Sequence, residues 1–442
     1  MAKRFAVVGG GWAGFSAAVE LARAGHQVTV YEAARTLGGR ARRVDIDQRA
    51  LDNGQHILLG AYREALRLMR LVGVDLGAAL LKLPLQMRYP AGSGMDFVTA
   101  RLPAPLHVGI ALLRARGLAR EDKLSLARFS TTARWMGWRL NTDCSVAELL
   151  ERFEQTPRLV QLMWRPLCLA ALNTPLERAS AQVFLAVLRD SLGAGRAASD
   201  MLLPRADLSA LFPATAAAWL RQKGHQVHLG AKIDTLQSRP SSRWLVGDTE
   251  FDGVVLATSP TAAAALLQPL EATAELVAQI ANLGSEPIAT CYLQYPAGTR
   301  LETPFYALVD DPASQRFGQF VFDRGQLDPQ QDGLFAVVIS AASAAAELAQ
   351  EQLAAALAAQ LAADLGQPAL AQPSWSRVIM DKRATFACTP GLERPANVTA
   401  LDGLVLAGDY TQGDYPATLE MAVRSGVQAA KLLVNAARRA RV

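Results

Sequence analysis

Four residues near the N-terminus have the types and spacing needed to bind a dinucleotide. Gly9, Gly11 and Gly14 stand at GxGxxG spacing after a short apolar run, and Glu32 ends a second apolar run. Glycines at these places allow a tight turn, close approach of the backbone to a pyrophosphate, and packing of a helix on a strand. A carboxylate about 20 residues further on accepts hydrogen bonds from ribose hydroxyls. The sequence therefore predicts a nucleotide site here.

The elements that must position these residues can be read from the same stretch. Residues 5–8 and 27–31 are short apolar runs, typical of strands buried in a parallel sheet, and residues 12–24 have helical periodicity. A helix that begins at the glycine turn directs its first N–H groups and the positive end of its dipole at the phosphates. We expect a Rossmann-like α/β unit.

Composition limits the other classes of protein. A chain of 442 residues can bury more than one core, and no apolar run reaches the length of a membrane span. The basic N-terminus leads directly into the nucleotide turn, so we expect no export signal. The four cysteines are scattered without paired spacing, which argues against a metal site, a disulfide scaffold or a CxxC centre. These features predict a cytoplasmic protein.

The positive charge is concentrated in residues 101–140. Eight basic and two acidic residues give this stretch a local net charge of +6, against +5 for the whole chain. The stretch also holds an apolar helix candidate at 106–113 and two tryptophans, Trp135 and Trp138. Such a surface could rest on the inner face of an anionic membrane, or it could be a solvated helical hairpin whose apolar stripe packs inward. Nucleic acid is not expected, because no binding motif accompanies the charge.

The residues after Glu32 resemble a known family. Two glycines and an arginine, Gly38, Gly39 and Arg40, follow the acid closely within Leu-Gly-Gly-Arg-Ala. Together with Glu32 they resemble the N-terminal signature of the flavin-containing amine oxidase and carotenoid desaturase superfamily. The resemblance implies FAD rather than NAD. Gly39 lets the backbone pass close to the cofactor, and the guanidinium of Arg40 is available for its phosphates.

Two further cofactor segments follow from this resemblance. The loop after an expected hairpin at 42–50 would run under the flavin ring, with Gly54 and Gln55 against it and His56 nearby. A later segment would hold the adenine through the backbone of Ile233.

The C-terminal part supplies the last cofactor segment. Gly408 and Asp409 follow the apolar run 404–407, which we expect to be a parallel strand. The resemblance implies that Asp409 binds the ribityl or pyrophosphate region of FAD. A helix over 417–437 would direct its N-terminus, at Thr418 and Leu419, toward the N1 and O2 edge of the flavin. A helix N-terminus stabilises the negative charge of reduced flavin there by about 0.3–2 kcal/mol.

The expected architecture is a discontinuous Rossmann-like FAD-binding domain joined to a mixed helical and antiparallel-sheet substrate domain. The FAD-binding domain would comprise residues 1–85, 205–262 and 385–442, with a helical cap at 86–204 and an antiparallel sheet at 263–384. Further helices are expected at 121–140, 146–154, 157–172, 181–192, 208–222 and 344–365, and sheet strands at 288–295, 305–309, 317–322 and 334–339.

Four segments narrow the resemblance to a subgroup. Residues 51–56, 199–205, 382–391 and 408–420 look like those of the hydroxysqualene dehydroxylases, also called squalene-associated FAD-dependent desaturases. The resemblance implies removal of the hydroxyl from an allylic triterpene alcohol to give squalene. In this chemistry the hydroxyl is protonated, water leaves, and hydride from N5 of reduced FAD reaches the allylic cation.

This chemistry needs a proton donor and a dry pocket lined by aromatic faces. His56 is the candidate acid. The candidate substrate contacts are Tyr62, Phe305, Phe320, Tyr410 and Tyr415.

Other functions stay open at this stage. A carotenoid-type desaturase would accept hydride from a polyene precursor, and sequence does not set the direction of electron flow. A flavin amine oxidase is disfavoured, because Thr290 stands where that family's strand carries a lysine. A non-catalytic flavoprotein or lipid carrier would share the same motifs. A second nucleotide-like loop at 193–198 follows a helix instead of a strand, so we expect a separate electron donor.

Overall fold

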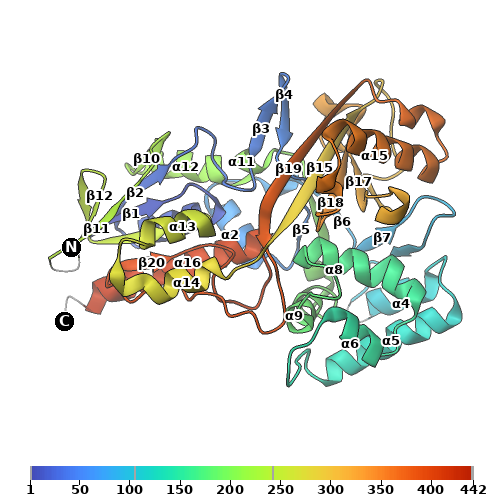
Figure 1. Ribbon diagram of the computed structural model, residues 1–442, viewed down its shortest axis with the longest axis horizontal. Coiled ribbons are helices and arrows are strands. Elements are labelled where there is room, and N and C mark those ends of the chain that lie inside the picture. The colour runs from blue at the N-terminus through green and yellow to red at the C-terminus, as the bar shows by residue number, and fades with distance from the viewer. Residues whose placement is uncertain (1, 104–105, 241–242, 440–442) are drawn as a thin grey trace.

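A five-stranded parallel sheet forms the core of the lobe that contains both chain ends (Figure 1). The computed structural model describes residues 2–103, 106–240 and 243–439. In spatial order the strands are β10 (Gln226–Leu229), β2 (Gln27–Glu32), β1 (Arg4–Val8), β14 (Gly253–Leu256) and β20 (Leu404–Leu406). All neighbours pair in parallel. Three distant parts of the chain thus build one sheet, which confirms the expected Rossmann-like fold.

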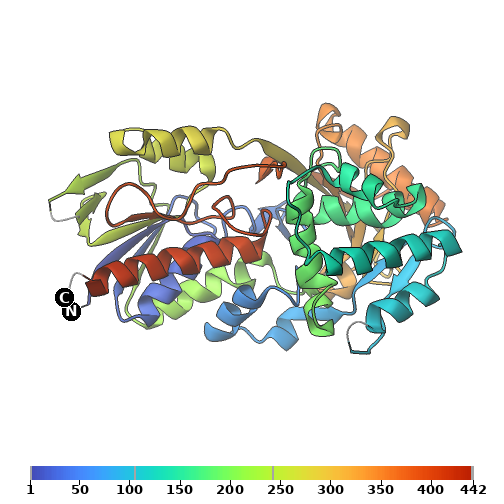
Figure 2. The same cartoon turned by 90° about the horizontal axis from the view of Figure 1, so that it is seen from below.

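Two helices pack closely together on one face of this sheet. They are α1 (Trp12–Arg23) and α16 (Leu419–Arg439), whereas α13 (Pro260–Leu267) lies on the opposite side (Figure 2). A Cβ on Gly426 of α16 would lie 2.1 Å from the carbonyl oxygen of Ala13, and one on Gly14 would lie 1.9 Å from that of Gly9. Only glycine permits these two approaches, which bring α1 against both its strand and α16.

The second lobe is built on a mainly antiparallel sheet. Its strands in spatial order are β16 (Phe305–Ala307), β17 (Phe320–Asp323), β18 (Leu334–Ser340), β15 (Ser285–Gln294) and β19 (Trp375–Phe386). One face of β15 packs in the core beneath α15 (Gln350–Asp364), through Ala289, Cys291 and Leu293. Side chains alternate along a strand, so the other face is free to meet the first lobe. The long strands β15 and β19 run between the two lobes (Figure 1).

The cap consists of short helices at the end of the molecule farthest from the chain ends (Figures 1 and 2). They are α4 (Leu106–Arg114), α5 (Arg120–Trp135), α6 (Val146–Arg152), α7 (Pro157–Leu159), a π-helical turn (Val160–Trp164), α8 (Arg165–Leu172), α9 (Ala181–Ser191) and α10 (Arg196–Ser199). Within the described chain, no helix combines the length and the apolar character needed to cross a bilayer.

Small elements complete the fold. The hairpins are β3 (Arg43–Ile46) with β4 (Arg49–Asp52) and β7 (Gln86–Arg88) with β8 (Asp96–Val98), and β5 (Leu58–Leu59), β9 (Met201–Pro204) and β6 (Leu80–Leu83) form a three-stranded sheet. The remainder are α2 (Arg63–Leu71), α3 (Leu76–Ala79), α11 (Leu208–Leu211), α12 (Pro213–Gln222), α14 (Ala274–Ala281), and the meander β11 (Leu236–Arg239), β12 (Arg243–Val246) and β13 (Thr249–Phe251).

Several expected elements differ in their limits. The helix expected at 208–222 is two helices, because Pro213 lacks the N–H needed to continue α11 and instead starts α12. The helix expected at 344–365 begins only at Gln350, and the strand expected at 317–322 begins at Phe320. Tertiary packing sets these ends, which local propensity does not encode.

The α1–α16 contact gives a stability prediction. Gly426→Ala should lower the free energy of unfolding by about 1–3 kcal/mol, because the new methyl group overpacks the interface with Ala13. The matched control is Gly109→Ala in α4, where a Cβ meets no atom within 4 Å and alanine favours the helix. Thermal unfolding of the two flavin-loaded variants measures the difference, and equal midpoints would contradict this account of the contact.

Candidate active site

A cavity of about 780 Å³ extends from the carboxyl ends of the parallel strands into the cap. Its first end is lined by Val8, Glu32, Ala257 and Gly408, which stand at or just after the ends of four of those strands. Strand order reverses at β1, and such a switch point is where open α/β sheets bind ligands. Its other end is apolar and is lined by Met87, Phe97, Met163, Leu167, Phe184 and Leu188.

The start of α1 is suited to a phosphate group. Gly11 is the N-cap residue and offers no side-chain hydrogen bond, and the first turn carries no acid. Gly9, Gly11, Trp12 and Ala13 line the cavity, while Gly14 lies behind them in the helix–strand contact. The first N–H groups of a helix have no acceptor within the helix, so these donors and the dipole favour an anion in the cavity.

Glu32 is held rigidly at the rim of the same region. Its Oε2 accepts a hydrogen bond from the Gly10 N–H at 2.6 Å, and its Oε1 accepts one from the Ala34 N–H at 2.8 Å. Each carboxylate oxygen keeps further acceptor capacity for a ribose hydroxyl. Ile233 lines the cavity nearby, where the N–H of Ala231 donates to the Glu32 carbonyl oxygen at 2.9 Å.

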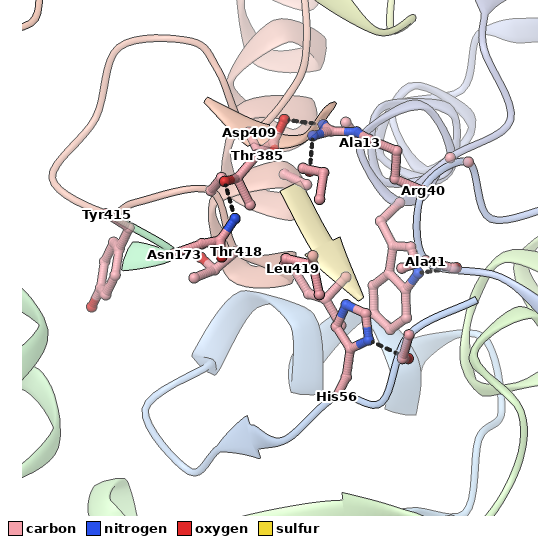
Figure 3. A pocket seen from close by; sticks show the side chains of 18 of the residues that line it. Ala13, Arg40, Ala41, His56, Asn173, Thr385, Asp409, Tyr415, Thr418 and Leu419 are labelled. Atoms are coloured by element: carbon pink, nitrogen blue, oxygen red, sulfur yellow. Dashed lines mark hydrogen bonds and ion pairs between the residues drawn. The ribbon is translucent and has the colours of Figure 1, made fainter. Parts of the chain in front are cut away.

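An ion pair between Arg40 and Asp409 joins the N-terminal loop to the end of β20 (Figure 3). Both residues line the cavity together with Gly39 and Gly408, and Arg40 also donates to the Ala384 carbonyl oxygen at 2.7 Å. Burial opposes the charge of Arg40, but Asp409 outweighs this effect and raises the pKa of the guanidinium. The guanidinium expected to be available for phosphates is therefore paired with Asp409.

The N-terminus of α16 also faces the cavity. Thr418 and Leu419 line it (Figure 3). Thr418 Oγ1 accepts a hydrogen bond from the Met421 N–H at 3.2 Å. Two helices from opposite ends of the sequence thus direct their positive ends into one space. A helix N-terminus favours negative charge, which suits a reduced flavin.

The loop after β4 places His56 in the cavity wall together with Gly54 and Gln55. His56 Nδ1 lies 2.8 Å from the Gly54 carbonyl oxygen, and since a carbonyl oxygen only accepts, Nδ1 carries the proton. Burial lowers the pKa of the imidazole. At neutral pH the ring is therefore neutral, and Nε2, which faces the Leu419 side of the cavity, is an acceptor (Figure 3).

Asp52 is the last residue of β4, directly before the loop that carries His56, and it does not line the cavity. Its Oδ1 accepts a hydrogen bond from the Leu208 N–H, and its carbonyl oxygen accepts one from the Tyr292 hydroxyl, both at 2.8 Å. Burial raises the pKa of the Asp52 carboxyl to about 6, although the Leu208 N–H and Arg324 oppose the shift.

Three of the five aromatic residues expected to contact substrate line the cavity, namely Tyr62, Phe320 and Tyr415. Phe305 does not line it, because its ring is buried behind Phe322, with the ring centroids 5.5 Å apart. Phe322 lines the cavity instead, two residues along β17 from Phe320 and on the same face. Because side chains alternate along a strand, the choice of Phe320 also indicated Phe322, and the sequence analysis did not use this signal.

Tyr410, the fifth aromatic residue, also lies outside the cavity lining. Its ring packs on Gly408, where a Cβ would come within 2.4 Å of it. Its hydroxyl is buried and has no hydrogen-bond partner among the described residues.

Asn173 joins the cap to the sheet in the cavity wall, and sequence analysis did not identify it. It ends α8 in a left-handed conformation with φ of 48°, which asparagine tolerates better than most residues. Its Nδ2 donates to Thr385 Oγ1 at 2.9 Å, and its Oδ1 accepts from the Ala341 N–H at 2.6 Å (Figure 3). The only sequence signal was an asparagine directly after a helical run.

A sequence model of the family described as flavin containing amine oxidoreductase matches residues 12–434. The chain belongs to this family. It is an FAD-dependent oxidoreductase, and the uncapped start of α1, the acid at Glu32 and the α16 N-terminus fit an FAD molecule that lies along the cavity. Among the described residues, no group of three or more His, Cys, Asp or Glu side chains could hold a metal ion.

Similar proteins span the whole chain. A hydroxysqualene dehydroxylase of Rhodopseudomonas palustris is 31% identical over 470 residues, covering 99% of this chain and 100% of the relative. One of Sinorhizobium fredii is 29% identical over 457 residues, covering 98% and 99%. A zeta-carotene desaturase of Synechocystis is 23% identical over 502 residues, covering 98% of each chain.

Solved structures with this fold include a putative protoporphyrinogen oxidase from Exiguobacterium, with a TM-score of 0.70, 16% identity and 99% coverage of both chains. An engineered putrescine oxidase has a TM-score of 0.71, with 17% identity and coverage of 98% of this chain and 99% of the other. These likenesses establish the fold.

Glu32 provides a test of the cofactor site. Glu32→Ala should raise the dissociation constant for FAD by about 10–100-fold, because charge-assisted hydrogen bonds are worth roughly 1.5–3 kcal/mol. Titration of the flavin-free protein with FAD, followed by flavin fluorescence, measures the constant. Glu250→Ala is the control, since Glu250 pairs on the surface with Arg243. Equal constants for both variants would show that the Glu32 carboxylate does not hold FAD.

Asp52 provides a pH test. Its carboxyl has a higher pKa in the folded state than its ordinary value, so its contribution to stability is present in acid and is lost as pH rises through about 6. Asp52→Asn removes this loss while keeping an acceptor for the Leu208 N–H. Relative to the natural chain, the variant should therefore gain about 2–3 kcal/mol of unfolding free energy between pH 4 and pH 8. Denaturant unfolding at both pH values measures the gain, and a pH-independent difference would contradict the buried carboxyl.

Proposed function

We propose that this FAD-dependent oxidoreductase reductively removes the hydroxyl group of hydroxysqualene and releases squalene. The observation that carries the proposal is the similarity, across nearly the full length of both chains, to the hydroxysqualene dehydroxylase of Rhodopseudomonas palustris. Two more proteins of that name, from Sinorhizobium fredii and Zymomonas mobilis, are similar over the same extent.

The two ends of the cavity support an isoprenoid substrate. The sheet end offers helix N-termini and the Glu32 carboxylate, which suit FAD, whereas the cap end offers aliphatic and aromatic side chains. Moving a hydrocarbon from water into such surroundings is favourable by roughly 25 cal/mol for each Å² of apolar surface buried. A long triterpene chain is therefore a better occupant than a small charged amine.

The residues around the cavity suit a reaction that passes through an allylic cation. Protonation of the hydroxyl lets the C–O bond break and water leave, and the allylic cation that remains accepts a hydride, H⁻, at carbon to give squalene. Bound reduced FAD supplies that hydride. Phe320, Tyr62 and Tyr415 exclude water and offer aromatic faces that attract a cation. Phe305 and Tyr410 lie outside the cavity lining, where Phe305 stacks on Phe322 and Tyr410 packs on Gly408.

We propose that His56 donates the proton, as the sequence predicts. The Nδ1–H is engaged by the Gly54 carbonyl oxygen, so only an imidazolium could donate, and it would do so through Nε2. Burial lowers the pKa, so the donating form is a minority at neutral pH and grows as pH falls.

Electrons must reach the flavin from outside the chain. Residues 193–198, the second nucleotide-like sequence, follow α9 and run into α10, so they do not follow a strand. We propose a separate reductase or a free reduced carrier as the donor.

A carotenoid-type desaturase is the second candidate, favoured by the similarity to the Synechocystis zeta-carotene desaturase. A flavin amine oxidase is the third, and Thr290 argues against it. That residue is buried in β15, and its hydroxyl has no partner within the described chain.

Anaerobic mixing separates the first two candidates. Reduced enzyme mixed with hydroxysqualene should regain the absorbance of oxidised flavin and yield one squalene per flavin, detected by mass spectrometry. Oxidised enzyme mixed with zeta-carotene or phytoene should stay oxidised. The reverse pattern would identify a desaturase, and no spectral change with any of these compounds would identify a flavoprotein that does not act on them.

The pH dependence of flavin reoxidation tests His56. The rate should increase as pH falls from about 8 to about 5, following the imidazolium population, and His56→Ala should abolish this dependence and lower the rate by about 10²–10⁴-fold. His225→Ala is the control, because His225 lies outside the cavity lining and its pKa is also lowered by burial. An unchanged rate in His56→Ala would remove His56 from the reaction.

A further inference from the structure

Large apolar side chains are exposed on the outer side of the cap. Five of the seven in the described chain belong to β8, α4 and α5, and we call these five the cap surface: Val98, Leu106, Leu113, Leu124 and Trp135. Leu113 is 75% exposed and Trp135 is 87% exposed. Exposed apolar residues gathered in one region mark a surface that meets a protein, a membrane or a ligand.

The helical positions form one apolar stripe on each of two helices, marked by two exposed residues each. Leu106 and Leu113 are seven residues apart in α4, and Leu124 and Trp135 are eleven residues apart in α5, so each pair lies on one side of its helix. The opposite sides are buried. Lys123 Nζ donates to the Leu113 carbonyl oxygen at 2.9 Å, which places the end of one stripe beside the start of the other.

Exposed arginines surround these stripes. They are Arg101, Arg114, Arg116, Arg120, Arg128, Arg134 and Arg139. Of these seven arginines, only Arg128 forms an ion pair with another described residue, and its partner is Glu154. The cap surface therefore combines apolar anchors with a high density of positive charge that nearby carboxylates do not neutralise.

We propose that the cap surface docks on an anionic lipid bilayer. Tryptophan and leucine at the tips of helices suit the interface between headgroups and acyl chains, and arginines bind lipid phosphates. A protein partner of comparable chemistry would have to be acidic, and a nucleic acid would leave the leucines without apolar contacts.

The cap surface lies one strand away from the apolar end of the cavity. In β8, Phe97 is buried and lines the cavity, whereas the next residue, Val98, is exposed on the other face. Helix α4 packs against the same strand. A hydrocarbon substrate dissolved in the bilayer would therefore have a short path to its pocket. This last step rests on the proposed function, while the docking itself does not.

Vesicle flotation with the full chain and without substrate tests the docking. The natural chain should float with vesicles of phosphatidylglycerol and phosphatidylcholine, and much less with phosphatidylcholine alone. Leu113→Glu combined with Trp135→Glu should lower the partition coefficient at least about tenfold, because both anchors become charged. Arg114→Gln and Arg134→Gln should lower it about fivefold each.

The matched control is Leu229→Glu combined with Val398→Glu. It changes the other two exposed large apolar residues of the described chain and should leave flotation unchanged. Flotation of the Leu113 and Trp135 variant equal to that of the natural chain would overturn the proposal. Failure of the natural chain to float would also overturn the proposal. This includes the case in which two copies of the chain associate through the cap surface and do not bind vesicles. Turnover of detergent-dispersed hydroxysqualene is measured separately, so its failure would count against the proposed function alone.

Discussion

The order of strands around β1 is the constraint on which the rest of the molecule depends. With β2 on one side and β14 on the other, the connections leave the sheet in opposite directions and open a crevice at the carboxyl ends. The crevice receives the N-terminus of α1, the carboxylate of Glu32 and the N-terminus of α16. The first two belong to one N-terminal unit and the third to the C-terminal segment, and the sheet makes these two segments neighbours.

Two polar contacts then tie the lobes and segments together around this crevice. The Arg40–Asp409 ion pair joins the N-terminal loop to the last parallel strand. Asn173 joins the cap to β19 and to the end of β18 through Thr385 and Ala341. Buried polar groups are costly unless their partners are placed correctly, so such contacts select one relative arrangement of the parts. That arrangement places an apolar chamber directly beyond the sheet end of the cavity, where water could be excluded from the proposed allylic cation.

The cap differs from the rest of the described chain because it exposes more large apolar side chains. Elsewhere in the described chain only Leu229 and Val398 are exposed large apolar residues, whereas α4 and α5 expose three leucines and a tryptophan close in sequence to several arginines. Exposing this surface to water is unfavourable, so the arrangement makes sense only if something covers it during function. If the substrate is the proposed triterpene, such a surface would meet the phase in which that substrate dissolves.

The sequence by itself determined the strand, glycine turn, helix and second strand that end at Glu32, because these features are local and their spacing is typical of a nucleotide-binding unit. It also determined the family, the βαβ start and most strands of the second sheet. Tertiary structure alone decided the rest. Whether Phe305 or Phe322 lines the cavity, whether Arg40 is free or paired, and which way the stripes of α4 and α5 face depend on which partners arrive from distant segments. Periodicity defines one face of an element but carries no information about what packs against it.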